Sequence, residues 1–278
     1  MPLWQLAARS RILHGDAIAF GPGRADLLKA IGQTGRRLAL IASLFIGSHA
    51  AAATIHVSAA ASLTDVLQEL GKSYQTQTGD RAVFNFGSSG TLARQILEGA
   101  PADVFLSADE RQMDRVAGKG FILGATRHSL LSNTLVVIAP TDSTLMLRSP
   151  KDLATDEVGR IAIGDPETVP AGDYARMYLR RAGVWNALSM KLIPVENVRA
   201  ALAAVEAGNV DCGIVYKSDA LISRQVRVAF EIAGTPEISY PAAIVATSRN
   251  RAAAQRFLDY LSSDGAKTAF RRYGFLTR

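Results

Sequence analysis

The segment from Thr54 to Leu70, TIHVSAAASLTDVLQEL, limits most tightly what this chain can fold into. Polar and apolar residues alternate from Thr54 to Ser58, as in a strand, and apolar residues recur at helical spacing from Leu63 onward. Ser62 therefore lies where a strand gives way to a helix. The first turn of a helix leaves backbone N–H groups without intrahelical partners and carries partial positive charge, so a small anion can bind there. Ser62 could instead only cap its own helix, and one junction does not decide between the two.

Three further junctions repeat this pattern. Ser89 follows the strand-like segment 82–86 and a Gly-Ser-Ser-Gly loop, Ala171 follows the strand-like segment 160–164, and Val198 opens a third helix. Each would present first-turn amides to an anion. The Gly-Ser-Ser-Gly loop could also be only a flexible turn, and it is not a Walker loop because no Gly-Lys-Ser/Thr follows.

Other polar residues have simpler interpretations. Tyr216 ends the strand-like run CGIVY and offers a phenolic hydroxyl, although a tyrosine there more often serves core or rim packing than ligand contact. Asp103 and Asp109 could form a carboxylate pair for acid–base chemistry, but no histidine accompanies them, so we expect turn and capping roles. The single cysteine, Cys212, lies in an apolar run and is expected to be a buried, inert thiol.

Residues 1–53 have the features of an N-terminal extension followed by a secretory signal peptide. Basic residues precede the apolar run 38–47, and cleavage is plausible after Ala50, Ala52 or Ala53. The apolar run is shorter than the about 20 residues that a membrane span needs. Removal of this region takes away six basic and two acidic residues, so the formal net charge falls from +6 to +2. Charge then gives little reason to expect a nucleic-acid partner.

Strand-like and helical segments alternate along the rest of the chain, which predicts an α/β fold with mostly parallel sheets flanked by helices. Two long extended runs, near 135–139 and 241–245, bracket a middle block. We therefore expect two lobes joined by two crossing strands, with the ligand at the carboxyl ends of the strands. Lobe 1 would comprise residues 54–134 and 243–278, and lobe 2 would comprise residues 135–242.

Seven segments, taken together and in order, carry a resemblance to a known family. They are AAASL at 59–63, SSGTLARQI at 88–96, GAPADVFLSAD at 99–109, GDPETVPAG at 164–172, ENVRAAL at 196–202, GIVYKSDA at 213–220 and RYGF at 272–275. The chain from Thr54 to Arg278 resembles the molybdate-binding proteins of ABC uptake systems. The resemblance implies a two-lobed, periplasmic-binding-protein-like fold of type II, a periplasmic location and a membrane permease as partner.

The resemblance also implies a binding site for an oxyanion. Ser62 and Ser89 would hold the anion through backbone amide and hydroxyl, Ala171 and Val198 through their amides, and Tyr216 through its hydroxyl. The protein would contact the oxygens and never ligate the metal directly. Molybdate is the expected ligand, with tungstate binding as well, and selectivity for tungstate or another tetrahedral oxyanion such as sulfate is the alternative. The resemblance implies no cofactor and a monomer.

One loop departs from the pattern of the family. Many relatives carry a more serine- or alanine-rich version of the Gly-Ser-Ser-Gly loop. If Gly90 must adopt a positive φ, an alanine at that position would abolish binding.

Two other classes of protein fit the sequence less well. A hydrolase would need a histidine, yet residues 54–278 contain only His56 and His128, with no G-x-S-x-G or H-E-x-x-H motif. We therefore expect that this protein is not an enzyme. A transcription factor with this fold would need a helix-turn-helix before residue 54, where a signal-like segment stands instead.

Overall fold

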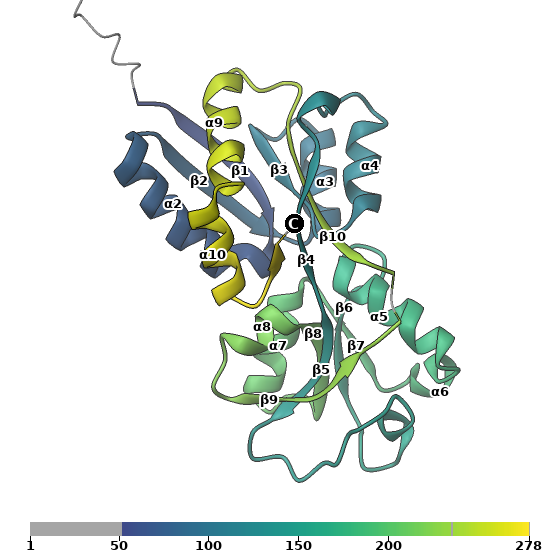
Figure 1. Ribbon diagram of the computed structural model, residues 1–278. Helices are drawn as coiled ribbons and strands as arrows, with labels where there is room; N and C mark the ends of the chain where they lie inside the picture. Colours follow the sequence, from purple (N-terminus) through teal and green to yellow (C-terminus); the bar gives the residue numbers. More distant parts are fainter. Residues whose placement is uncertain (1–51, 235, 278) are drawn as a thin grey trace, which may run out of the picture. The chain divides into compact units, whose positions relative to one another are not determined.

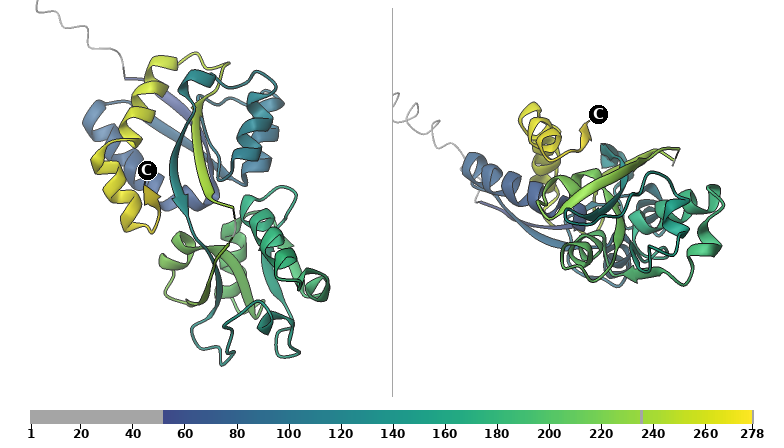
Figure 2. Two further views of the ribbon diagram at one scale, coloured as in Figure 1. Left: turned by 45° about the vertical axis from the view of Figure 1, so that its right-hand side comes forward. Right: turned by 90° about the horizontal axis from the view of Figure 1, so that it is seen from below.

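Two β-sheets, each with its own helices, organise the protein into two lobes (Figures 1 and 2). The computed structural model describes residues 52–234 and 236–277. The predicted extension and signal peptide therefore lie outside the described residues, apart from their last two positions. None of the helices in the described ranges is long and apolar enough to cross a membrane.

The first lobe contains a six-stranded sheet in the order β11-β4-β10-β3-β1-β2. Its strands are β1 (Thr54–Ala60), β2 (Arg81–Gly87), β3 (Val104–Leu106), β4 (His128–Asn133), β10 (Ile238–Ile244) and β11 (Leu276–Thr277). Its helices are α2 (Thr64–Thr78), α3 (Ser89–Leu97), α4 (Glu110–Ala117), α9 (Arg251–Leu261) and α10 (Asp264–Arg272). Strand β1 runs parallel to β2 and β3, whereas β10 and β11 form antiparallel pairs.

Alternating side chains of β3 show how the helices cover both faces of this sheet. Val104 and Leu106 pack in the cluster that includes α2 and α9, while Phe105 packs in the cluster of α3 and α4. Successive side chains of a strand point to opposite faces. The helices α2, α9 and α10 therefore cover one face and α3 and α4 the other, as Figure 1 shows.

The second lobe contains a five-stranded sheet in the order β7-β6-β8-β5-β9. Its strands are β5 (Leu135–Pro140), β6 (Ile161–Gly164), β7 (Leu192–Val195), β8 (Cys212–Tyr216) and β9 (Val226–Ile232). Its helices are α5 (Pro170–Arg181), α6 (Trp185–Leu188), α7 (Val198–Glu206) and α8 (Lys217–Leu221). Short 3-10 turns lie at Ala61–Leu63, Gly124–Thr126 and Asp152–Ala154.

The predicted α/β class with two lobes is confirmed, and two details are corrected. Each sheet is mixed rather than mostly parallel, because the long strands β4, β5 and β10 run antiparallel to their neighbours. The chain leaves the first sheet after Asn133, the last residue of β4, and rejoins it at Ile238, the first residue of β10. The boundary at 242/243, where the chain was predicted to return to lobe 1, is therefore too late. Hydrophobicity marks this extended run but does not show which sheet its backbone pairs with.

Helix α2 ends at Gly79, whose φ of +78° is the left-handed conformation typical of a C-cap glycine. The structural roles predicted for Asp103, Asp109 and Cys212 are confirmed. Asp109 caps α4 by accepting the Gln112 N–H, and Asp103 accepts the His56 N–H at 2.8 Å. The Cys212 thiol is fully buried, and burial raises its pKa to about 12. It therefore stays protonated and unreactive at neutral pH.

Candidate ligand-binding site

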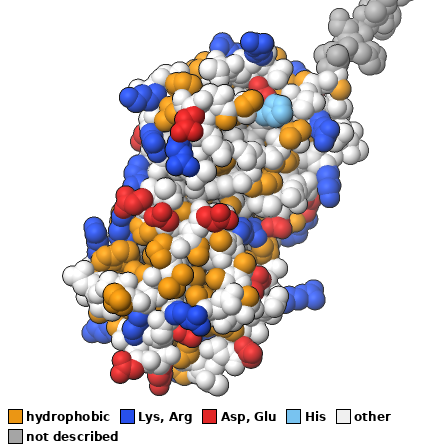
Figure 3. All heavy atoms as spheres, turned by 180° about the vertical axis from the view of Figure 1, so that it is seen from behind, with side chains coloured by type: hydrophobic (Ala, Val, Ile, Leu, Met, Phe, Trp, Pro, Cys, Tyr) orange, Lys and Arg blue, Asp and Glu red, His pale blue; other side chains and the backbone are white. Residues whose placement is uncertain are grey.

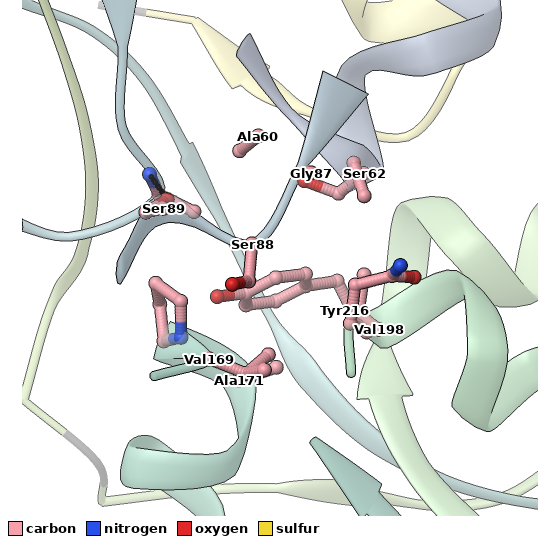
Figure 4. A pocket seen from close by; sticks show the side chains of 13 residues that line it. Ala60, Ser62, Gly87, Ser88, Ser89, Val169, Ala171, Val198 and Tyr216 are labelled. Atoms are coloured by element: carbon pink, nitrogen blue, oxygen red, sulfur yellow. Dashed lines mark hydrogen bonds between the residues drawn. The ribbon is translucent and has the colours of Figure 1, made fainter. Parts of the chain in front are cut away.

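All five predicted ligand residues line one cavity between the two sheets (Figure 4). The cavity leaves about 10 Å³ for the centre of a water-sized sphere, far less than the roughly 300–1,000 Å³ of sites for drug-sized ligands. It therefore suits a small ion. The lining residues are Ala60, Ala61, Ser62, Gly87, Ser88, Ser89, Ala108, Val169, Pro170, Ala171, Asn197, Val198 and Tyr216.

Ser62 lies in the 3-10 turn between β1 and α2, and it does not cap α2. The helix begins at Thr64, and its N-cap residue, Leu63, makes no side-chain capping bond. The Ser62 hydroxyl is instead 3.1 Å from the hydroxyl of Tyr240. The alternative that Ser62 merely caps its own helix is thus wrong.

Ser89 is the first residue of α3, and its neighbour Ser88 is the cap. The Ser88 hydroxyl accepts the Thr91 N–H at 3.2 Å. The Ser89 hydroxyl oxygen accepts the Ala108 N–H at 2.9 Å, and the Ser89 O–H does not take part in this bond as a donor. The hydroxyl hydrogen of Ser89 is consequently left to donate to a ligand. Ser88 therefore caps the helix and Ser89 lines the cavity, so the Gly-Ser-Ser-Gly loop is more than the flexible turn that the sequence also allowed.

Ala171 and Val198 contribute helix starts from the second lobe. Pro170 is the first residue of α5, a position that suits proline, and the Ala171 amide lies in the first turn, where intrahelical acceptors are lacking. Val198 is the first residue of α7, which Asn197 caps by accepting the Ala200 N–H at 3.0 Å.

Gly172, the next residue after Ala171, has a structural role. Its N–H donates to the Val169 carbonyl at 3.0 Å. A Cβ at this position would lie 1.9 Å from the Gly164 oxygen. Gly172 therefore allows α5 to pack closely on β6 and does not supply a donor to the cavity.

Tyr216 is the last residue of β8, and its ring lies across the cavity in Figure 4. The ring packs 5.9 Å from that of Tyr240, so core packing is part of its role. Its hydroxyl, however, is buried and has no hydrogen-bond partner among the described residues. Burial raises the pKa of Tyr216 well above its usual value, so the phenol remains a donor. A buried hydroxyl without a partner is costly and indicates a position meant for a ligand oxygen.

Tyr240 and Asn133 support the site although sequence reasoning missed both. The Asn133 side-chain amide donates to the Tyr240 hydroxyl at 3.3 Å and to the Ser218 hydroxyl at 2.8 Å. The Tyr240 hydroxyl accepts from Asn133 and also bonds to the Ser62 hydroxyl, and either of these two hydroxyls can donate to the other. Ser62 and Tyr240 are 178 residues apart, and no local pattern could have paired them.

No charged side chain is among the residues that line the cavity. An anion there would be balanced by amide dipoles, helix starts and hydroxyl groups. The described residues also contain no cluster of histidine, cysteine and carboxylate side chains that could hold a metal cation. On the face drawn in Figure 3, basic and acidic side chains are interspersed rather than gathered into one basic stripe.

Comparison with known proteins places the chain in a family. A family model described as bacterial extracellular solute-binding protein matches residues 55–276. The chain belongs to this family. Its members are binding proteins rather than enzymes, in agreement with the sequence prediction.

Individual relatives are similar over most of their length. The chain is 45% identical over 235 residues to the molybdate-binding protein ModA of Escherichia coli (strain K12), covering 80% of this chain and 88% of the relative. It is 40% identical to ModA of Haemophilus influenzae, covering 82% and 92%. The periplasmic molybdate-binding protein of Azotobacter vinelandii shares the fold, with a TM-score of 0.74 at 24% identity over 81% of this chain and 99% of that one.

Proposed function

We propose that this solute-binding protein captures molybdate, and tungstate as well, and delivers it to the permease of an ABC importer. The cavity carries the proposal, because it gathers potential donors from both lobes around a buried hydroxyl that has no partner in the described part of the chain. Ser62 and Ser89 would donate from the first lobe, and Ala171, Val198 and Tyr216 from the second. The names of the ModA relatives support the same ligand.

The donor set itself selects among anions. A cavity that offers only donors leaves the O–H of a protonated ligand without an acceptor, which is unfavourable when that group is buried. Molybdate and tungstate are unprotonated near neutral pH, whereas phosphate keeps one or two protons. Phosphate should therefore bind poorly.

Sulfate has the same charge as molybdate, so it must be rejected by size. A smaller tetrahedron cannot reach the donors of both lobes at hydrogen-bond length. Selectivity for tungstate, or for sulfate itself, is the alternative function. Molybdate and tungstate are close in size, and we expect both to bind.

We infer that the mature protein acts in the periplasm as a monomer. The signal-like features of residues 1–53 support export. The membership of the solute-binding family supports work outside the cytoplasm next to a membrane permease.

Thermal shift measurements test the proposal. The full chain would be expressed and the exported protein heated with molybdate, tungstate, sulfate or phosphate at equal concentration. A ligand at about 100 times its Kd stabilises by about 2.7 kcal/mol, which raises Tm by roughly 5–10 °C for a chain of this size. We expect that shift with molybdate and tungstate only. A shift with sulfate alone, or with none of the anions, would contradict the assignment.

A further inference from the structure

The side chain of Arg199 connects the two lobes next to two residues of the cavity lining, Ser62 and Val198. Arg199 follows Val198 in the first turn of α7, which belongs to the second lobe. Its Nη2 donates to the Ser62 carbonyl at 3.2 Å and forms an ion pair with Asp65 of α2 at 2.6 Å. Both partners belong to the first lobe. Arg199 thus holds the backbone of one cavity residue from the opposite lobe.

The same guanidinium group forms an ion pair with Asp219 within its own lobe. Arg199 Nε lies 2.8 Å from Asp219 Oδ1 without hydrogen-bond geometry, and the Asp219 side chain is completely buried. The other carboxylate oxygen, Oδ2, accepts the backbone N–H of Tyr216 at 3.2 Å. Three of the five cavity residues are therefore linked to Arg199: Ser62 directly, Val198 as its chain neighbour, and Tyr216 through Asp219.

Arg199 separates two carboxylates that would otherwise repel each other. Asp65 lies on the first lobe and Asp219 on the second, so without the arginine two negative charges would approach each other when the lobes meet. A planar guanidinium can bind two carboxylates and a carbonyl at once, which a lysine ammonium on a flexible stem does less well. Arg199 converts a repulsion between the lobes into an attraction.

We propose that Arg199 is a positioning residue, which fixes Ser62 opposite Val198 and Tyr216 without itself touching the anion. This inference rests on the proposed function, since it assigns a role in the same site. Arg199 is absent from the cavity lining, so its effect on binding is indirect. Arg199 sets the distance between the donors of the two lobes, and this distance decides whether one ligand can reach both sets.

The sharpest variant is Asp65→Asn, because it weakens the contact between lobes and leaves the pair of Arg199 and Asp219 intact. The matched control is Asp114→Asn, which removes an exposed carboxylate paired at 2.7 Å with Arg127 within the first lobe. Titration calorimetry with molybdate would give Kd. We expect Asp65→Asn to raise Kd about threefold, as befits a half-exposed pair, and Asp114→Asn to leave it within twofold.

Replacement of Arg199 itself needs a companion change. Arg199→Met alone leaves a buried carboxylate unpaired and can prevent folding. The double variant Arg199→Met/Asp219→Asn removes both charges and keeps similar volumes. We expect the double variant to fold, to raise the Kd for molybdate at least about tenfold and to speed molybdate dissociation in stopped-flow experiments. The single variant Arg199→Lys, which keeps the charge but not the planar guanidinium, should bind molybdate with an affinity between those of the double variant and the wild-type protein.

Three outcomes separate the possibilities. Wild-type affinity in both Asp65→Asn and the double variant would overturn the role of Arg199. If the wild-type protein binds neither molybdate nor tungstate, the proposed function fails. Small-angle X-ray scattering without anion then tests Arg199 by itself: a larger radius of gyration for Asp65→Asn than for Asp114→Asn supports it, and equal radii overturn it.

Discussion

At the scale of single residues, the hydroxyl of Tyr216 should matter more for binding than for folding. Tyr216→Phe removes one donor to a charged ligand, and such bonds contribute about 1.5–3 kcal/mol. We expect molybdate affinity to fall about tenfold or more in titration calorimetry. The Tm of the ligand-free protein should not fall, because the lost hydroxyl has no partner among the described residues.

Tyr178→Phe is the matched control for this change. Tyr178 is a partly buried tyrosine of α5 that is absent from the cavity lining. Its loss of a hydroxyl should leave Kd unchanged. Equal affinities for Tyr216→Phe and the wild-type protein would reject the Tyr216 hydroxyl as a donor.

The buried carboxyl of Asp219 should make stability depend on pH. Burial raises its pKa from 3.8 to about 6, although Arg199 acts in the opposite direction. A group with a raised pKa binds protons more tightly in the folded state, so its contribution to stability is present at low pH and is lost as pH rises through about 6. Between pH 7 and pH 5, this carboxyl should increase the free energy of unfolding by about 1 kcal/mol.

Urea unfolding at pH 5, 6 and 7 would measure this contribution. Other carboxyls also titrate over this range, so the comparison is between the wild-type protein and Asp219→Asn. The difference in unfolding free energy between the two should change by about 1 kcal/mol from pH 7 to pH 5. Parallel pH profiles would show that Asp219 has an ordinary pKa.

At the scale of elements, Gly90 shows how α3 meets the second lobe. The sequence left open whether Gly90 needs a positive φ. Gly90 lies in the first turn of α3 and does not adopt one. Its N–H donates to the Thr168 carbonyl of the other lobe at 3.0 Å, and a Cβ would lie 2.4 Å from that oxygen. The reason for glycine is the close approach of two backbones.

Gly90→Ala should therefore hinder closure of the lobes rather than folding of either one. Overpacking at a tight contact costs about 1–3 kcal/mol, so we expect the Kd for molybdate to rise about tenfold with little change in the ligand-free Tm. Gly124→Ala is the control, since a Cβ there meets nothing within 4 Å. If Gly90→Ala bound molybdate like Gly124→Ala, the contact with Thr168 would be irrelevant to binding.

Helix starts can be predicted from the local sequence, whereas contacts between distant elements cannot. Ser89, Ala171 and Val198 could be found because helix starts follow from local periodicity and from residues such as Pro170. The bonds of Ser62 to Tyr240 and to Arg199 could not, because they join segments more than 130 residues apart. The pairing of the whole of β10 within the first sheet was missed for the same reason.

At the scale of the whole molecule, the proposed division of donors between the lobes predicts a conformational change on binding. Ser62 and Ser89 belong to the first lobe, while Ala171, Val198 and Tyr216 belong to the second. A ligand that contacts both sets favours the closed arrangement by its difference in affinity for the two states. Hinge closure in periplasmic binding proteins is an established example of this motion.

Small-angle X-ray scattering would show whether anion size decides closure. Molybdate and tungstate are large enough to reach both sets of donors, so each should decrease the radius of gyration at saturation. Sulfate has the same charge but, bound to the donors of one lobe, would leave the other set too distant for hydrogen bonds, so the radius should stay at its ligand-free value. Equal compaction by sulfate would mean that the lobes close on any tetrahedral dianion, and selectivity would then have to arise from the strength of individual hydrogen bonds rather than from reach.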